Sequence, residues 1–261
     1  RIFFSSYLGR DIFRFDERQG FNWGNRTGTI RWNHLFNDRL FSNFTTIYSN
    51  YDYQLAFGSD DRNKFEWDSK IETLNLKPEF TYFINTNNEF SIGGEFLIYR
   101  FEPANAQGVS DGKITDITLP KKYAFESSIY FGNEQKINNI SFSYGLRTST
   151  YTYLGPGTKY IFNLPTNPGD RKTIDSEEKM DKWKNIQSFS NLEPRISINY
   201  KLNDSNSLKI SYNKMVQYIH LLSNTAASSS LDVWTPSTNN IKPEKVDSYA
   251  IGYFKNFKEN I

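Results

Sequence analysis

The stretch Thr73–Ile84, TLNLKPEFTYFI, alternates polar and apolar side chains with a period of two. Successive side chains of a β-strand point to opposite faces, so the stretch predicts a strand with one apolar and one polar face. The apolar set is Leu74, Leu76, Pro78, Phe80, Tyr82 and Ile84, and the polar set is Thr73, Asn75, Lys77, Glu79 and Thr81. Full charges on the polar face are typical of a strand that lines a wet interior.

The same alternation recurs along the chain, for example from Leu192 to Leu202 and from Ile140 to Arg147. Runs rich in Phe, Tyr, Ile, Thr and Ser between polar joints predict about ten strands. Their approximate bounds are 1–15, 27–36, 40–57, 70–84, 89–103, 122–136, 140–155, 189–202, 207–222 and 247–257.

The joints between these strands alternate between short and long. The short joints are Asn37–Arg39, Asn85–Asn88, Asn138–Asn139 and Asn203–Asn206, and Asn and Asp cap turns through their own side chains. The long joints cover about 16–26, 58–69, 104–121, 156–188 and 223–246. Short connections at one end and long ones at the other predict an all-β, antiparallel up-and-down meander.

Composition narrows the class of protein. The 261 residues are 37% hydrophobic and 17% aromatic, with a mean hydropathy of −0.66 and no apolar run long enough for a membrane helix. The absence of cysteine excludes disulfides, thiolate metal sites and cysteine nucleophiles. A net charge of +2 with both signs mixed along the chain gives no case for a nucleic-acid partner.

Two architectures fit an alternating meander, a soluble sandwich and a transmembrane barrel. Strand length, a charged face and aromatic residues near strand ends all favour the barrel, whose tilted strands need about 9–11 residues. Three basic residues, Arg10, Arg14 and Lys214, fall in the lipid-facing phase. Either those strands have left the bilayer at these points, or a bulge resets the register.

The segment Asn240–Glu244, NIKPE, followed by Tyr249–Tyr253, YAIGY, resembles the loop-to-strand signature of TonB-dependent receptors. Pro194–Ile198 and Ser207–Lys214 are similar to the preceding barrel hairpin of that family. Further segments resemble members from Bacteroidota, and the resemblance extends from about Thr29 to Phe254. These segments are Arg31–His34, Leu40–Phe44, Leu76–Phe80, Tyr153–Gly157, Gln217–Asn224 and Leu231–Pro236.

The resemblance implies a plugged barrel of about 22 strands in the bacterial outer membrane. Residues 1–261 would then be a partial barrel domain, cut at both ends, without the plug domain, the TonB-contacting segment or a signal peptide. It implies uptake of a scarce nutrient such as a glycan, peptide or siderophore, with no enzymatic activity and no cofactor. The implied partners are outer-membrane lipid, a TonB-type energising system acting through the plug, and a surface lipoprotein.

Two other functions remain open. One is an outer-membrane barrel that serves assembly or surface interactions without active transport. The other is an outer-membrane enzyme, which lacks a catalytic constellation here, because no nucleophile–base pair emerges from the sequence. The full-length sequence separates uptake from the first alternative, since a plug and a TonB-contacting segment favour uptake.

Candidate ligand-binding residues are the aromatic side chains expected on long extracellular loops and the histidine next to one of them. These residues are Trp23, Trp67, Trp183, His220 and Trp234. Flat rings stack on sugars or chelates, although a loop tryptophan also serves to pin its own loop. His34 and His220 are too few and too far apart for a metal site, and Asp60–Asp61 offers only two carboxylates. The acidic run Asp175–Glu178 is expected in a solvated loop or a short loop helix.

Overall fold

The computed structural model describes residues 1–16, 18–164, 167, 169–222 and 233–257. Its regular structure is entirely β in these ranges. No helix of this part of the chain has the length and apolar character to cross a membrane.

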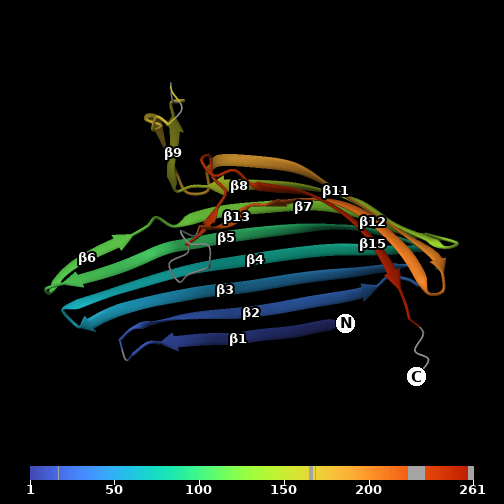
Figure 1. The fold of residues 1–261 in the computed structure, drawn as a ribbon, viewed down its shortest axis with the longest axis horizontal. Helices are drawn as coiled ribbons and strands as arrows, with labels where there is room; N and C mark the ends of the chain where they lie inside the picture. Colours follow the sequence, from blue (N-terminus) through green and yellow to red (C-terminus); the bar gives the residue numbers. More distant parts are fainter. Residues whose placement is uncertain (17, 165–166, 168, 223–232, 258–261) are drawn as a thin grey trace.

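Ten long strands form one antiparallel wall in which sequence neighbours pair in order (Figure 1). The wall strands are β1 Ile2–Arg14, β2 Gly20–Leu35, β3 Leu40–Asp60, β4 Asn63–Asn85, β5 Asn88–Ser110, β7 Lys122–Ile137, β8 Ile140–Leu154, β11 Asn185–Asn203, β12 Asn206–Gln217 and β15 Glu244–Lys255. Strands β1 and β15 lie at its two edges, so the described sheet is an open, curved wall. The predicted all-β up-and-down meander is confirmed.

Five short strands lie at the long-connection end of the wall. β6 Lys113–Thr118 extends the wall beside β5, β9 Gly157–Phe162 pairs with β10 Ile174–Met180, and β13 Ile219–Leu222 pairs with β14 Val233–Pro236. The β9–β10 hairpin projects away from the wall (Figure 1). The β13–β14 hairpin lies against the wall, and β14 contacts β5.

Asparagine side chains close the short turns as expected. Asn37 Oδ1 accepts the backbone N–H groups of Arg39 and Leu40, both at 2.9 Å. Asn85 and Asn203 each accept a backbone N–H two residues further on, also at 2.9 Å. Asn138 adopts a positive φ of 50°, which asparagine tolerates better than most residues.

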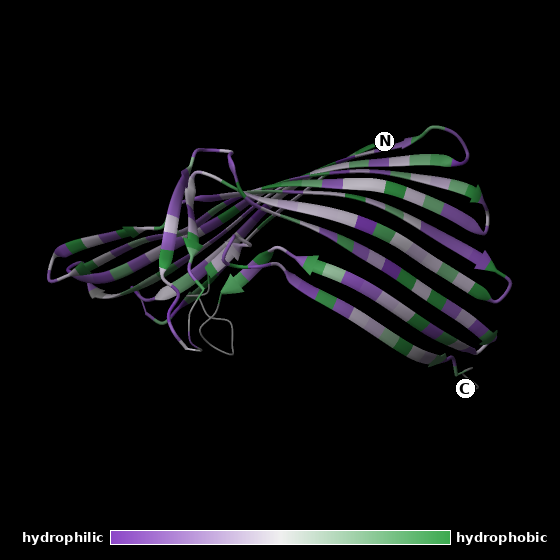
Figure 2. Cartoon of the chain, turned by 90° about the horizontal axis from the view of Figure 1, so that it is seen from above, coloured by the Kyte–Doolittle hydropathy of each residue, from purple (hydrophilic) through white to green (hydrophobic). Residues whose placement is uncertain are grey.

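The pairing register places the two residue sets of each strand on opposite faces of the wall. Leu74 pairs with Tyr48 and Ile98 on the outer face, and Asn75 pairs with Ile47 and Leu97 on the inner face. Alternating hydrophilic and hydrophobic bands along the strands are visible in Figure 2. The apolar set of Thr73–Ile84 is largely exposed on the outer face, as a lipid-facing surface requires.

An aromatic cluster covers the outer face near the short turns. Trp32 stacks on Phe44 at 5.3 Å between ring centroids, and His34 packs edge-on against Phe36 at 4.4 Å. Phe80 meets Phe44 at 5.5 Å. Rings at a strand end on the outer face are typical of the aromatic girdle at a membrane interface, and His34 is one of these rings.

Three of the predicted long loops are shorter than expected. Strands β3 and β4 continue until only residues 61–62 separate them, and β5 and β6 form a hairpin through Asp111 and Gly112, both with positive φ. The loop expected over 16–26 is reduced to 15–19, because β2 begins at Gly20. The location expected for the acidic run Asp175–Glu178 is also wrong, because the run belongs to the exposed strand β10 rather than to a loop or helix.

The register decides between the two explanations for Lys214. The β12–β15 ladder runs without a shift from Asn206 to Gln217, so no bulge turns Lys214 inward. Lys214 stays on the outer face and forms an ion pair with Asp247 at 3.5 Å. Arg10 also stays in the outer phase, where it pairs with Asp52. These charges indicate that the strands have left the apolar layer by these points.

The hydrophobic core lies on the inner face, beneath the β13–β14 hairpin. It consists of inward side chains of four wall strands together with Tyr218, which connects β12 to β13. The members are Phe101, Ala124, Tyr151, Tyr153, Ile186 and Tyr218. The hairpin is therefore packed against the inside of the wall rather than standing free above it.

Candidate functional site

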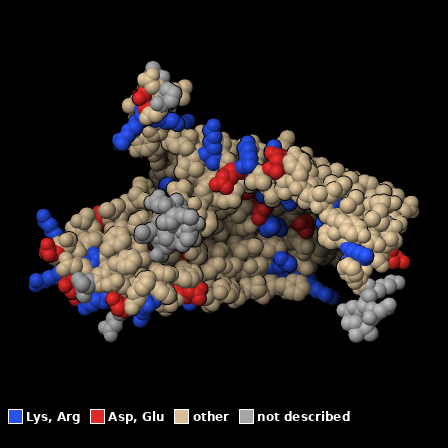
Figure 3. Space-filling model, in the orientation of Figure 1, with Lys and Arg blue, Asp and Glu red and all other residues tan. Residues whose placement is uncertain are grey.

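A charged cluster occupies the inner face of β5, β7, β8 and β11. Arg147 forms ion pairs with Glu95 at 3.0 Å, Glu126 at 3.5 Å and Glu193 at 3.8 Å. Figure 3 shows charges of both signs gathered in the hollow of this face. The four side chains are mostly buried, and three carboxylates share one guanidinium, so Arg147 is the charge that makes this arrangement tolerable.

Polar neighbours complete the cluster. Lys77 pairs with Glu95 at 3.5 Å, and Asn75 donates to the same carboxylate at 2.9 Å. Tyr99 donates its hydroxyl to Glu126 at 3.2 Å. No group of three or more His, Asp or Glu side chains in the described ranges is arranged to hold a metal ion. The cluster can therefore offer charge and hydrogen bonds to a passing solute.

A chain of hydrogen bonds joins the cluster to the core above it. Glu193 accepts the Ser149 hydroxyl at 2.7 Å, and Ser149 Oγ lies 2.7 Å from the hydroxyl of Tyr218. The ring of Tyr218 stacks on Tyr151 with centroids 4.8 Å apart and planes 7° from parallel. Asn191 donates to the Tyr218 hydroxyl at 2.9 Å. The start of the last long connection is thus bonded to the charged cluster through Ser149.

The β13–β14 hairpin is fastened to the wall by buried polar contacts. His220 is 5% exposed, with Nε2 at 2.8 Å from Ser237 Oγ and Nδ1 at 3.3 Å from Glu244 Oε1. Tyr151 donates to the Ser237 carbonyl at 3.2 Å, and Lys122 donates to Thr235 Oγ1 at 2.9 Å. His220 therefore holds the hairpin closed, and the fully buried Ser237 is not open to a substrate.

Trp23 and Trp67 lie in wall strands and not in loops, which corrects their expected location. Phe21, Leu55 and Trp67 occupy one row across β2, β3 and β4 on the inner face, and Trp23 stacks on Phe21 at 5.6 Å. The indole nitrogen of Trp67 is buried without a hydrogen-bond partner in the described part of the chain. The two tryptophans thus lie on the inner face near the long-connection end, with the fully buried Leu55 between Trp67 and Phe21.

The other two tryptophans lie on connecting segments. Trp183 follows β10 with a positive φ of 66° and is 52% exposed, and its ring packs on Tyr123 at 5.3 Å. Trp234 lies in β14, opposite Leu221 and one residue from the partner of His220. His220 and Trp234 thus lie in the same hairpin but point to opposite faces of it, whereas Trp183 is on a separate connection. Residues 223–232 of the same predicted loop lie outside the described residues.

Sequence reasoning missed the charged cluster. Alternation assigns Arg147 and Glu193 to the polar faces of two separate strands, but the β8–β11 register that sets them opposite each other cannot be read from one strand. The available signal was full charges repeated in the inward phase, at Lys77, Glu79, Arg147, Glu193 and Arg195.

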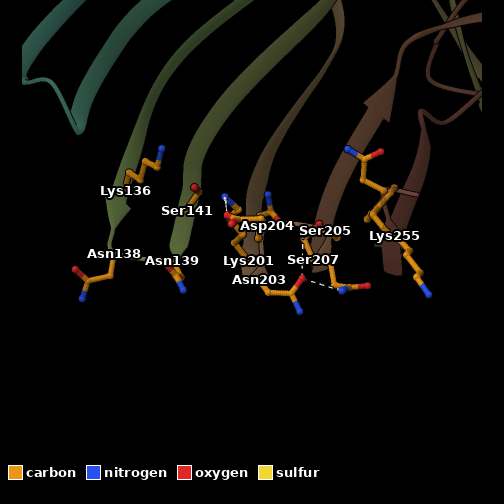
Figure 4. Close-up of a pocket in the computed structure, with 14 residues that line it drawn as sticks. Lys136, Asn138, Asn139, Ser141, Lys201, Asn203, Asp204, Ser205, Ser207 and Lys255 are labelled. Carbon is orange, nitrogen blue, oxygen red and sulfur yellow. Dashed lines mark hydrogen bonds and ion pairs between the residues drawn. The ribbon is translucent and has the colours of Figure 1, made fainter. Parts of the chain in front are cut away.

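A second polar recess lies at the short-turn end of β7, β8, β11, β12 and β15 (Figure 4). Its contacts are local, such as Lys201 with Asp204 at 3.1 Å and Asn206 with Asn203 at 2.8 Å. These bonds close a hairpin turn, so the recess is a rim of turn residues and the charged cluster is the stronger candidate site.

Replacing His220 with alanine is expected to loosen the β13–β14 hairpin. A two-stranded hairpin is marginal alone, and the change leaves the buried Ser237 hydroxyl without its partner. Amide hydrogen exchange in β13 and β14 should rise about tenfold, with the β12–β15 ladder unchanged. Leu222→Ala, at an exposed position of the same strand, is the control. Equal exchange in the two variants would contradict the role given to His220.

Comparisons with known proteins agree with this architecture. No curated protein matches the sequence. Among solved structures, the chain superposes on the copper transporter OprC with a TM-score of 0.61 and 10% identity, over 95% of this chain and 43% of that one. For the ferric-catecholate import receptor Fiu of E. coli K12, the TM-score is 0.61 and the identity 14%, over 95% of this chain and 40% of that one. For the unliganded ferric citrate transporter FecA, the TM-score is 0.56 and the identity 11%, over 90% of this chain and 32% of that one.

These superpositions concern the fold, and the chain spans less than half the length of each of these solved structures. The family model described as "TonB dependent receptor-like, beta-barrel" matches residues 3–257, nearly the whole chain. The chain therefore belongs to the TonB-dependent receptor-like β-barrel family, whose members reside in the bacterial outer membrane, and its ten-stranded wall is part of such a barrel.

Proposed function

We propose that the full-length protein is a TonB-dependent receptor that takes up a scarce nutrient through a plugged barrel. The observation that carries the proposal is the inner face, where buried ion pairs around Arg147 line a wall whose outer face is apolar. A charged inner surface suits a path for a polar solute, and it supplies passage and selectivity rather than bond chemistry.

We place the first contact with the nutrient at the extracellular end. Trp23 and Trp67 on the inner face, with Trp183 and Trp234 on the connecting segments, form the ligand-binding set of this proposal, and the buried His220 supports it by holding the hairpin that carries Trp234. A flat or ring-shaped solute can stack on the exposed part of a tryptophan ring. The structural neighbours are a copper transporter, a ferric citrate transporter and a ferric-catecholate import receptor, and at 10–14% identity their likeness bears on the fold alone. We therefore do not extend the proposal to a particular nutrient.

Growth of a deletion strain on single nutrient sources tests the proposal. We expect growth to fail on one source and to return with the full-length gene, but not with a version that lacks the TonB-contacting segment of the plug. Unchanged growth on every source would contradict uptake. Rescue by the version without that segment would contradict TonB-driven transport.

A role in assembly or surface interaction is the second candidate, and the β9–β10 hairpin favours it. Tyr160, Ile161 and Phe162 on β9 are all more than a third exposed, on a hairpin that projects from the wall. An exposed apolar ribbon is a surface on which a protein partner, such as a surface lipoprotein, can pack. Deleting residues 159–178 separates the two functions, because uptake then persists while partner binding is lost.

A further inference from the structure

The upper outer face of β1–β5 carries a belt of charged and polar residues. Two adjacent cross-strand rows form it, and both follow the pairing register without interruption. The lower row is Leu8, Arg26, Asn50, Glu72 and Arg100, and the upper row is Arg10, Gly24, Asp52, Lys70 and Glu102. Lys121 joins the upper row through Glu102 at 3.0 Å. We call these two rows with Lys121 the outer belt.

The rows directly below the outer belt are largely apolar. The next row toward the short turns is Ser6, Gly28, Tyr48, Leu74 and Ile98, and the one after it is Phe4, Ile30, Thr46, Leu76 and Phe96. In an outer-membrane barrel, this change from apolar to charged rows marks the upper limit of the hydrocarbon layer. The outer belt therefore lies at the level of the lipid headgroups in the outer leaflet.

Ion pairs link most of the belt into one network. Glu72 pairs with Lys70 at 2.8 Å and Arg100 at 3.2 Å, and Arg100 also pairs with Glu102 at 2.7 Å. Arg10 pairs with Asp52 at the other end. These contacts hold the belt in place, but five cations face only three carboxylates. The belt keeps an excess of positive charge on the face that meets lipid.

Arg26 is the cation left over. It is exposed, and within the described residues it forms no ion pair and no side-chain hydrogen bond. Its two neighbours along β2 on the same face are glycines. Arg10 covers Gly24, whereas a side chain added at Gly28 would meet nothing within 4 Å. The space next to Arg26 is therefore open on the side of the apolar rows.

We propose that the outer belt binds phosphate groups of lipids in the outer leaflet, with Arg26 as the residue that contacts the phosphate. A lipid fits both parts of this surface, since its phosphate meets Arg26 while its acyl chains lie along the apolar rows around Leu74 and Leu76. Charge complementarity favours an anionic headgroup over a zwitterionic one. The proposal is independent of what the receptor transports.

Native mass spectrometry of the purified full-length receptor in a neutral detergent tests this inference. The probes are phosphatidate and phosphatidylcholine with the same acyl chains. Phosphatidate is expected to bind more tightly, and Arg26→Gln to weaken its binding about fivefold. Arg26→Lys keeps the charge and should retain most of the affinity. Because Arg26 is exposed and unpaired, these variants are expected to fold as the parent does.

Lys113→Gln is the matched control, since it removes one exposed cation from β6, outside the belt. It should leave phosphatidate binding unchanged. An equal loss in Arg26→Gln and Lys113→Gln would overturn the proposal, because binding would then follow net charge alone. Equal affinity for the two lipids would also overturn it. So would inorganic phosphate that displaces phosphatidate with comparable affinity, because the belt would then be a site for free anions.

Discussion

Replacing Ile210 with arginine is expected to lower the free energy of unfolding of the full-length receptor by about 2–4 kcal/mol. Ile210 lies on the outer face between Ile198 and Ile251, in a row made of apolar side chains. An arginine there puts a charge into hydrocarbon, where neither water nor a carboxylate is present to stabilise it. The midpoint of urea unfolding in phospholipid vesicles measures the effect.

The control for this change is one residue away. Ser211 lies on the inner face next to Lys209, a lysine that the chain already carries in that phase. Ser211→Arg is expected to cost less than about 1 kcal/mol, because a lumenal charge stays in water. Similar losses in the two variants would show that the faces have been assigned wrongly.

Replacing Arg147 with alanine is expected to destabilise the receptor by about 3 kcal/mol, because it removes one partner of a buried ion-pair group. Glu95, Glu126 and Glu193 would then remain close together without their shared cation. Their mutual repulsion and incomplete hydration are the cause of the loss. Thermal unfolding of the full-length receptor in detergent, followed by the mobility shift on semi-native gels, measures it.

Two further variants separate repulsion from a simple loss of packing. The double variant Arg147→Ala with Glu126→Gln should recover part of the stability, since it removes one of the three carboxylates. Arg195→Ala, at an exposed arginine of the same face without an ion pair in the described residues, should change stability by less than about 0.5 kcal/mol. A double variant no more stable than Arg147→Ala would contradict the electrostatic explanation.

The membrane-spanning part of the wall could be predicted because lipid imposes a pattern on it. From Leu74 to Ile84 every second side chain meets hydrocarbon, so the alternation is strict. Above the outer belt this requirement ends. Residues near Asp60 and Asn105 keep their ladder hydrogen bonds, but the apolar side chains at this level, such as Leu55 and Trp67, lie on the inner face and the outer face is polar, so the pattern predicts loops there.

The candidate site could be predicted only in part. Aromatic residues near the mouth are visible in the sequence, and their phase places Trp23 and Trp67 on the inner face once strands are assigned. The charged cluster depends on four strands meeting at one height. Glu95 and Arg147 are 52 residues apart, and only the summed register of the hairpins between them brings the two side chains to 3.0 Å. The side-chain pattern of a single strand does not show how the registers of several hairpins combine.

The strands β4 and β5, each 23 residues long, have a consequence for how a solute is captured. The outer belt marks the upper limit of the bilayer near Lys70 and Glu102, so residues 63–69 of β4 and 103–110 of β5 extend roughly 25 Å along the strands beyond it, at about 3.3 Å per residue. The upper parts of β4 and β5 form a rim, and this rim blocks part of the path by which a molecule on its inner side diffuses back into the medium. The molecule collides with the inner surface many times before it diffuses away. For the uptake that we propose, the height of the rim would lengthen the residence of a solute near the mouth and raise the chance of its recapture at low nutrient concentration.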